Sequence, residues 1–593
     1  MTEEGILSQI LSVQQILDSL DNESLEEAKK FIHSQINFFE DKFHLRKLLL
    51  CLQSFTNSRP SQLPLYLEII RDISSDLKKF YSSDELFALF QNREVKLLLL
   101  ELGLIDIKSL IDLDQHNESL HFFFAPEIKK SFPSKKFSIR NFNEYLDTFD
   151  INEHIEKRKM LKNPDILAFA IQNDDIDTFL SIISSTNTDL NAKIPDSFFE
   201  PYQIINERCM LPTIAEYAAF FGALQIFKYL LMNSVSLDKF KTKLAVAGGN
   251  LEIIHFLEEK GHKFDTQCLN TAIEYQRNDI VRYFHDILEV KYDERSLNAS
   301  ITYDNCIFFE DIIKEISDTN PNSFTGIINK MLSIASSCGN LELTNYLCER
   351  CNDDSSKYSA LNLACQKGFL DIVTFFIVNK HLSVSDSRFS GLFDACKFGH
   401  FQTVEFLCGL EGINVNYIYS VSKETPIMIA CLYSRLDIVK FLADIPECNL
   451  EHSMYNYRTP IFRAVEGQNF DIVKFLADEK HVNLSVIGMG GENLLDIACE
   501  KENVEIVKYL VNEKGFDINS SRPLGNAISN NRIEIVKFLV SKNCNLVNHE
   551  TKWTAVHSAA FYWRYELLPI LLDSQKIDIN AVANDGVLFF KNS

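Results

Sequence analysis

Apolar and polar residues alternate along the last third of the chain with the period of an α-helix, and nearly the same nine residues recur there. The copies are DIVKFLADI (437–445), DIVKFLADE (471–479), EIVKYLVNE (505–513) and EIVKFLVSK (534–542). In the second copy Ile472, Val473 and Phe475 share one face at helical spacing. The acidic residue that opens each copy suits the positive end of a helix dipole. The pattern predicts a recurring amphipathic helix whose apolar face builds a core.

A second, shorter helix is predicted before each copy, and a column of small residues marks it. The column, seven residues before each copy, comprises Ala168, Ala218, Ala245, Ala272, Ser300, Ala335, Ala364, Ala395, Ala430, Ala464, Ala498, Ala527 and Ala559. A mostly aliphatic column lies eight residues after it, from Ile176 to Leu567. Successive units are 27 to 35 residues apart, except for a gap of 50 between the first two. A small residue at this position allows stacked helices to approach closely.

Pairs of short helices cannot bury their apolar faces alone, so they must stack on one another. The sequence therefore predicts an all-α solenoid of about thirteen helix-turn-helix units over residues 164–593. We expect an insertion at about 191–210 and a partial repeat or cap at about 580–593.

Residues 1–163 lack both columns, and periodicity predicts helices across 26–55 and 82–111 with a break at 58–64. We expect a helical domain that packs on the first repeats and caps the N-terminal end of the solenoid. The aromatic, locally basic segment 121–138 is predicted to be a loop, either a surface connection or a docking site for a partner.

The repeated units resemble ankyrin repeats, whose pattern runs T-P-L-H-x-A-A-x-x-G-H-x-x-I-V-x-x-L. ETPIMIACLYSRLDIVKFLAD and RTPIFRAVEGQNFDIVKFLAD carry the resemblance, and WTAVHSAA keeps the motif histidine as His557. The inter-helix glycine is kept as Gly222, Gly249, Gly339, Gly368 and Gly399. Many units lack T-P and several span only 27 to 29 residues, so short or missing β-hairpin fingers are expected. Divergent arrays behind a helical N-terminal region also resemble the expanded, uncharacterised ankyrin proteins of protists.

Composition limits which binding partners and which cellular compartment are expected. A net charge of −23 disfavours nucleic acid and anionic membranes as partners, and is explained either by solubility or by a basic protein partner. The N-terminus has no basic stretch of a secretory signal, and the most apolar run, 95–107, is too short to span a bilayer. Fourteen cysteines without paired short spacings fit a reducing compartment. We predict a cytoplasmic protein without membrane insertion, with the nucleus as the alternative; the sequence makes no prediction of oligomeric state.

Sequence motifs of catalysis and of metal binding are absent. No H-E-x-x-H, G-x-S-x-G, G-x-x-x-x-G-K-[ST] or helix-opening G-x-G-x-x-G occurs, and the Cys348-x-x-Cys351 pair has no second pair near it. Cys365, Cys396, Cys431 and Cys499 each follow a column alanine, which indicates small packed hydrophobes. The sequence predicts no catalytic residue, no cofactor and no metal site; an enzyme hidden in a degenerate fold is the remaining alternative.

The resemblance to ankyrin repeats implies that partners bind the concave face formed by the finger tips and the first helix of each unit. The third position after the small-residue column is aromatic in six units: Phe221, Tyr275, Tyr303, Phe398, Tyr433 and Tyr562. The architecture does not require an aromatic residue there, and such residues are enriched at binding hot spots. We predict that they bind protein partners; the alternative is packing against neighbouring helices.

The last unit carries the densest candidate cluster, with Trp553, Phe561 and Tyr562 predicted on the concave side. Finger residues Tyr455, Asn456 and Arg458 are a second candidate. Because NDGVLFFKNS begins another finger, the cluster either binds a partner or lies under an improvised cap. The resulting hypothesis is a non-enzymatic scaffold or adaptor. The alternative is a client-selecting adaptor whose N-terminal domain recruits an effector such as degradation machinery.

Overall fold

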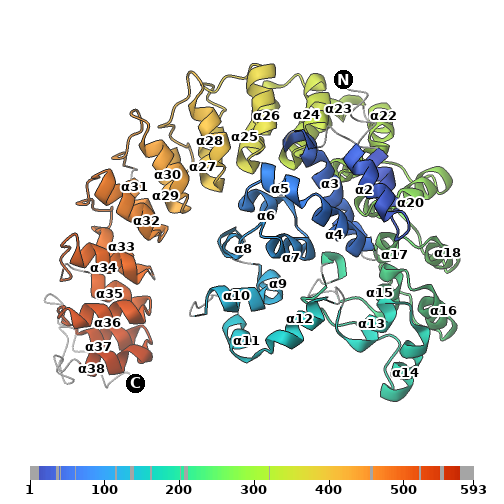
Figure 1. Cartoon of the computed structure of the whole chain (residues 1–593), viewed down its shortest axis with the longest axis horizontal. Helices are drawn as coiled ribbons and strands as arrows, with labels where there is room; N and C mark the ends of the chain where they lie inside the picture. Colours follow the sequence, from blue (N-terminus) through green and yellow to red (C-terminus); the bar gives the residue numbers. More distant parts are fainter. Residues whose placement is uncertain are drawn as a thin grey trace. The chain divides into compact units, whose positions relative to one another are not determined.

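The computed structural model describes residues 12–34, 39–40, 42–59, 62–113, 117–133, 139, 141–159, 163–200, 202–205, 211–319, 321–453, 458–501, 503–519, 522–547 and 553–573. These residues are helical and contain no β-strand (Figure 1). Two isolated antiparallel bridges, Lys193 with Thr213 and Val547 with Thr554, stand where hairpin fingers would be. The prediction of an all-α solenoid with short or missing fingers is confirmed. The chain divides into two compact units, unit 1 (Met1–Asn340) and unit 2 (Leu341–Ser593).

Unit 1 begins with a domain of short helices. These are α2 (Leu25–Ser34), α3 (Lys42–Ser58), α4 (Leu63–Asp72), α5 (Ser74–Phe80), α6 (Ser83–Leu89), α7 (Arg93–Glu101), α8 (Ile107–Leu113), α9 (Glu118–Phe123), α10 (Ala125–Ser131), α11 (Phe142–Thr148) and α12 (Ile151–Lys159). One apolar core joins them, with Leu48, Phe90 and Phe123 fully buried. Caps divide the helix predicted over 82–111, since Ser82 opens α6 in a capping box and the Asn92 side chain caps α7.

The predicted loop at 121–138 is wrong as far as residue 131, because α9 and α10 occupy this stretch. Pro126 stands in the first turn of α10, where its missing N–H costs no helical hydrogen bond. Phe123, Phe124 and Ile128 point into the core and drive the segment to fold. Residues 134–138 lie outside the described part of the chain.

Helix pairs then follow along the chain, as predicted. Unit 1 holds α13 (Ile166–Gln172) with α14 (Ile176–Thr186), the short η3 (Gln203–Ile205), α15 (Ile214–Phe221) with α16 (Leu224–Met232), α17 (Thr242–Gly248) with α18 (Leu251–Glu259), α19 (Thr266–Glu274) with α20 (Asn278–Arg282) and η4 (Tyr283–Ile287), α21 (Glu294–Thr302) with η5 (Cys306–Phe308) and α22 (Phe309–Thr319), and α23 (Pro321–Cys338). Consecutive first helices pack on one another, α15 on α17 and α17 on α19.

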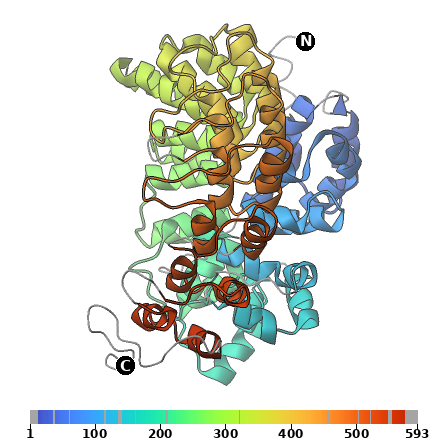
Figure 2. The same ribbon diagram turned by 90° about the vertical axis from the view of Figure 1, so that its left-hand side faces the viewer.

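Unit 2 continues the same pattern, pair upon pair (Figure 2). It holds α24 (Leu341–Arg350), α25 (Asp354–Lys367) with α26 (Leu370–Thr374) and η6 (Phe375–Asn379), α27 (Gly391–Phe398) with α28 (Phe401–Cys408), α29 (Pro426–Leu432) with α30 (Leu436–Ala443), α31 (Pro460–Glu466) with α32 (Phe470–Lys474) and η7 (Phe475–Glu479), α33 (Leu494–Glu500) with α34 (Val504–Asn512), α35 (Pro523–Ser529) with α36 (Ile533–Ser541), and α37 (Ala555–Phe561) with η8 (Tyr565–Leu567) and α38 (Leu568–Asp573).

Every residue of the small-residue column is buried, as close packing of the first helices requires. The column needs one correction, in the first pair. In most other units the column carbonyl accepts the backbone N–H five residues later, as Ala430 does from Arg435 at 2.9 Å. In the first pair Asp175 donates to Ala170, also at 2.9 Å. The equivalent residue is therefore Ala170, because Ala168 lies in the first turn of α13, where its N–H binds the capping Asp165.

The turn between the two helices of a pair has a left-handed residue in most units. Gly222, Gly249, Gly339, Gly368 and Gly399 have φ between 70° and 87°. Where glycine is missing, another residue adopts the same conformation, as Gln276, Asp304, Ser434, Gln468 and Asn531 do with φ of 54° to 60°.

The residue after the turn binds the preceding unit. His400 Nε2 lies 2.8 Å from the Gln366 carbonyl, and Arg532 Nε donates to the Glu500 carbonyl over 3.0 Å. These bonds satisfy carbonyl groups at the C-terminal ends of first helices, which have no partner within the helix. The turns therefore hold consecutive units in register.

Candidate protein-binding surfaces

Three of the six predicted aromatic residues lie in unit 1 and contact their neighbours there. The ring of Phe221 lies 4.8 Å from that of Tyr217 and 5.0 Å from that of Phe220. Tyr275 is half-buried, with its ring 6.4 Å from Phe220. Tyr303 is 37% exposed, and burial together with the neighbouring Glu274 carboxylate raises the pKa of its phenol.

The aromatic residues at the C-terminal ends of α27 and α29 in unit 2 are also exposed. Phe398 is 37% exposed and Tyr433 is 44% exposed. The ammonium of Lys397 lies 5.3 Å from the centroid of the first ring and 5.6 Å from that of the second. The lysine thus joins two successive units into one exposed aromatic and cationic surface.

The last described helix pair presents the C-terminal aromatic cluster, which comprises Trp553, Phe561, Tyr562, Trp563 and Tyr565. The ring of Phe561 lies 5.5 Å from that of Trp553 and 5.0 Å from that of Tyr562, while the rings of Trp563 and Tyr565 are 6.0 Å apart. Phe561, Tyr562 and Trp563 are 62%, 45% and 72% exposed. The sequence interpretation that covers this cluster with a cap involves residues 580–593, which lie outside the described part.

Local structure explains why these rings lie together. The Thr554 hydroxyl accepts a hydrogen bond from the backbone N–H of His557, and the Thr554 backbone N–H donates to Nδ1 of His557, so that a capping box starts α37. Phe561 is the last residue of that helix and Tyr562 caps it. Trp563 takes the left-handed position of the turn, with φ of 59°. A turn conformation that glycine would favour is thus used here to expose a large ring.

The finger candidates are placed only in part, since Tyr455 and Asn456 lie outside the described residues. The guanidinium of Arg458 lies 2.5 Å from the Glu466 carboxylate and 4.0 Å from that of Glu492. It also stacks over the ring of Phe462, 5.4 Å from the centroid. Arg458 therefore links consecutive fingers of unit 2.

The cysteines are placed as packed side chains. Cys365, Cys396, Cys431 and Cys499 are buried beside the small-residue column. Cys348 and Cys351 are free thiols, and burial raises the pKa of both. Among the described residues no group of three or more His, Cys, Asp or Glu side chains could hold a metal ion. In the same residues no helix is long and apolar enough to cross a membrane.

A buried polar cluster in unit 1 escapes sequence reasoning. The Glu200 carboxylate accepts hydrogen bonds from Tyr217 at 2.5 Å and Gln172 at 2.7 Å, and burial raises its pKa to about 7. Burial likewise raises the pKa of Glu94 to about 7, against the attraction of the Arg93 guanidinium 3.7 Å away. No motif marks these residues, because they come from α7, α13, α15 and the insertion, which meet only in the fold.

The inserted segment between the first two pairs packs on the N-terminal domain. Arg93 Nη1 donates to the Phe198 carbonyl over 2.5 Å. The Phe198 ring lies 5.7 Å from that of Phe122, 5.9 Å from that of Tyr145 and 5.8 Å from that of His154. The insertion thus fixes the domain to the first repeats through an aromatic contact, which we call the insertion contact.

Stacked helix pairs joined by left-handed turns define the chain as a helical-repeat solenoid protein. Its C-terminal part contains ankyrin repeats: a family model for ankyrin repeats (3 copies) matches residues 376–453, 445–522 and 495–583. A second family model, described as a domain of unknown function (DUF3447), matches residues 232–314. The family predicted from the sequence is confirmed, and ankyrin repeats are protein-interaction modules.

Solved ankyrin domains are similar to part of the chain. The crystal structure of the human ASB11 ankyrin repeat domain has 20% sequence identity and a TM-score of 0.31, covering 34% of this chain and 94% of that one. The ankyrin repeat domain of Bcl-3, described as a unique member of the IkappaB protein family, has 22% identity and a TM-score of 0.29, covering 33% and 91%. No curated protein matches the chain.

Proposed function

We propose that the protein is a non-enzymatic scaffold or adaptor that binds a partner protein through unit 2, with the C-terminal aromatic cluster as the main contact. The observation that supports this is the exposure of Phe561, Tyr562 and Trp563 side by side on one helix end. Contiguous exposed aromatic surface is uncommon on soluble proteins, and tryptophan and tyrosine dominate binding hot spots.

The charge of the chain indicates the rest of the partner's surface. A net charge of −23 steers basic surfaces toward the protein and repels acidic ones. We therefore expect a partner with an apolar centre that covers the aromatic rings and a basic rim around it. Because the repeats are already folded, binding needs little ordering of this chain.

The test is a double substitution, Phe561→Ala with Tyr562→Ala, in the full chain. The matched control is Val421→Ala with Ile487→Ala, which removes exposed apolar side chains from finger positions of the same unit. Proximity labelling and co-purification from native cells would compare both variants with the wild type. We expect proteins enriched with wild type to be lost with the aromatic variant, by at least tenfold, and kept with the control. An unchanged partner set, with unchanged circular dichroism, would contradict the proposal.

A further inference from the structure

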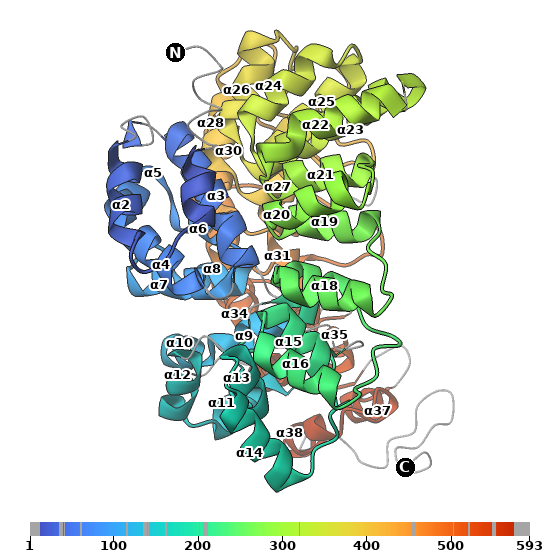
Figure 3. The same ribbon diagram turned by 90° about the vertical axis from the view of Figure 1, so that its right-hand side faces the viewer.

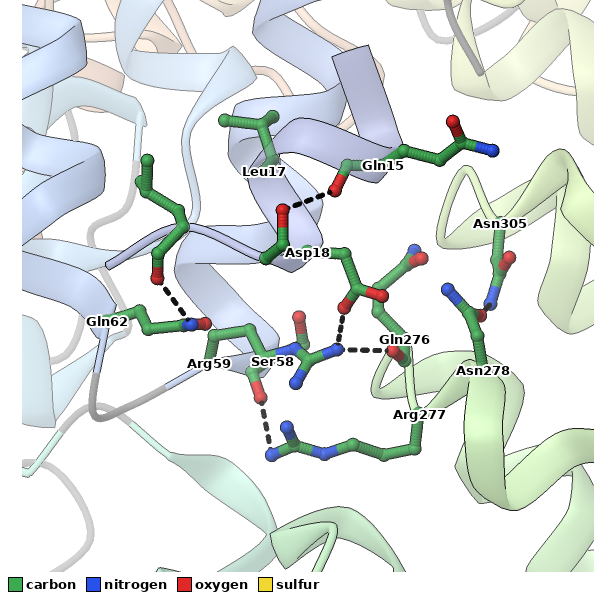
Figure 4. Close-up of polar contacts among 12 residues, drawn as sticks. Gln15, Leu17, Asp18, Ser58, Arg59, Gln62, Gln276, Arg277, Asn278 and Asn305 are labelled. Atoms are coloured by element: carbon green, nitrogen blue, oxygen red, sulfur yellow. Dashed lines mark hydrogen bonds and ion pairs between the residues drawn. The ribbon is translucent and has the colours of Figure 1, made fainter. Parts of the chain in front are cut away.

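The N-terminal domain makes a second contact with the repeats, far along the sequence from the insertion. It involves the helix at 12–18, α3 and the turns that follow α19 and α21, and we call it the seam (Figure 3). Arg59 pairs with Asp18 and donates from Nη2 to the Gln276 carbonyl over 2.7 Å. Arg277 Nη2 donates in return to the Ser58 carbonyl over 3.3 Å (Figure 4). Each side of the seam therefore contributes one arginine, which donates to a backbone carbonyl of the other side.

The next unit along the array is held in the same way. Ser54 Oγ donates to the Tyr303 carbonyl over 2.5 Å and accepts from Gln276 Nε2 at 2.9 Å. Gln14 Nε2 donates to the Asp304 carbonyl over 2.6 Å. The bonds go to the left-handed residues of the two turns or to their immediate neighbours.

A third unit is reached farther along α3. A Cβ placed on Gly339, the left-handed residue after α23, would lie 2.4 Å from a guanidinium nitrogen of Arg46. Contacts with successive units thus involve Ser58, then Ser54, then Arg46, which are four and then eight residues apart. At about 1.5 Å per residue these steps are about 6 Å and 12 Å, on either side of the 8–10 Å between packed helices. Helix α3 therefore meets the array once per repeat.

The seam buries the inter-helix turn of unit 1 at Gln276, whereas two equivalent turns of unit 2 are exposed. Gln276 is only 1% exposed. Ser434 and Gln468, which hold the same left-handed position in unit 2, are exposed. The occupant in unit 1 is a segment of the chain itself.

The seam is polar and incompletely satisfied, in contrast to the aromatic insertion contact. Gln14 Oε1, Ser58 Oγ, Arg59 Nε and Gln276 Oε1 are buried without a hydrogen-bond partner in the described part of the chain. A buried polar group without a partner destabilises the contact that buries it. Polar contacts of this kind are typical of domains that move relative to each other. The seam can therefore open while the insertion contact keeps the domain attached.

We propose that the turns after α19, α21 and α23 form a helix-binding edge, that α3 occupies it as an intramolecular ligand, and that a partner helix with the same donors displaces α3. The partner helix carries an arginine and a hydroxyl side chain five residues apart, as Arg59 and Ser54 are. This inference rests only on contacts within unit 1 and is independent of the function proposed for unit 2.

The first test opens the seam in the full chain with Arg59→Glu and follows backbone hydrogen exchange by mass spectrometry. Arg71→Glu, on the exposed side of α4, is the matched control. We expect peptides covering 274–279 and 302–306 to exchange at least tenfold faster in the first variant only. Exchange within α7 stays at the wild-type rate. Unchanged exchange at the turns would overturn the inference, and so would equal acceleration in α7, because the domain would then be unable to stay folded without the seam.

A second variant weakens the seam without straining the backbone, in case Arg59→Glu prevents the chain from folding. Gln276→Gly removes the side-chain bonds to Ser54 and to the Tyr303 carbonyl, yet glycine adopts the φ of 57° without strain. We expect faster exchange at 302–306 with a repeat array as stable as the wild type.

Binding of a separate helix to the turns is tested with a synthetic peptide of residues 42–59, which includes α3. Added to the Arg59→Glu chain, it should restore slow exchange at 274–279 and 302–306. The same peptide carrying Arg59→Glu should leave exchange fast. Absence of protection by the first peptide, or equal protection by both, would overturn the assignment of the turns as a helix-binding edge.

Discussion

At the scale of single residues, the buried carboxyl groups of unit 1 make its stability depend on pH. Burial raises the pKa values of Glu94 and Glu200 in the folded chain to about 7, from the usual value of 4.5 for a glutamate. Between these limits the folded chain binds more protons than the unfolded one, so the free energy of unfolding falls as pH rises. The loss begins near pH 4.5 and is complete just above pH 7. Each group contributes up to about 3 kcal/mol.

We therefore predict that Glu94→Gln raises the urea midpoint at pH 8 and changes it little at pH 4.5, because the neutral amide no longer has to be deprotonated in a buried site. Circular dichroism of the full chain at the two pH values measures the difference from wild type. Glu68→Gln, on the exposed surface of α4, serves as the control. A Glu94→Gln chain whose midpoint follows the wild type at both pH values would show that Glu94 stays ionised or becomes hydrated.

Side chains at the same position of the repeat differ in exposure from unit to unit, and the sequence could not show which of them are exposed. Phe221 and Tyr562 both stand three residues after a column alanine. Phe221 meets the inserted Tyr202, with ring centroids 6.3 Å apart, whereas Tyr562 is 45% exposed. What covers an aromatic ring depends on a segment outside the repeat pattern. Exposure at the predicted candidates could therefore be settled only in the folded chain.

At the scale of helices, periodicity predicted the pairs well because each apolar face must be buried against a neighbour. Boundaries set by caps were harder to predict, as α6 and α7 show. The seam could not be predicted at all, because Ser54 and Arg59 read as ordinary polar residues of an amphipathic helix.

The turn itself gives a prediction at this scale. Gly368 has φ of 74°, and an added Cβ would lie 2.4 Å from Nδ1 of His400, whose ring binds the preceding turn. Gly368→Ala should lower the free energy of unfolding of unit 2 by about 2–3 kcal/mol, combining backbone strain with displacement of the ring.

Gly515→Ala is the matched control, since Gly515 has φ of 71° with no atom near the added methyl. It should cost only about 1 kcal/mol, the strain alone. Urea unfolding of both variants measures the two effects. Equal losses would mean that His400 moves without cost and contributes nothing to the link between units.

At the scale of the whole molecule, the chain contains two compact units, and the contacts that stabilise the repeats differ between them. Unit 1 carries repeats held by the N-terminal domain through the seam and the insertion contact. In the described part of unit 2, consecutive first helices pack on one another, as α29 does on α31 and α33 on α35. In such arrays stability is the sum of local terms, so separate segments can unfold separately.

Both tryptophans of the chain, Trp553 and Trp563, lie in the last described helix pair and report on it alone. In the described part of the chain, α37 packs on the first helix of one neighbouring pair, α35, whereas α33 packs on both α31 and α35. We predict that tryptophan fluorescence changes at a lower urea concentration than far-UV circular dichroism, which follows all helices. Trp563→Phe, which leaves Trp553 as the single reporter, should keep the early transition, because Trp553 lies beside the buried start of α37. If fluorescence and circular dichroism instead coincide at every urea concentration, the last pair is as stable as the rest and the array unfolds as one cooperative block.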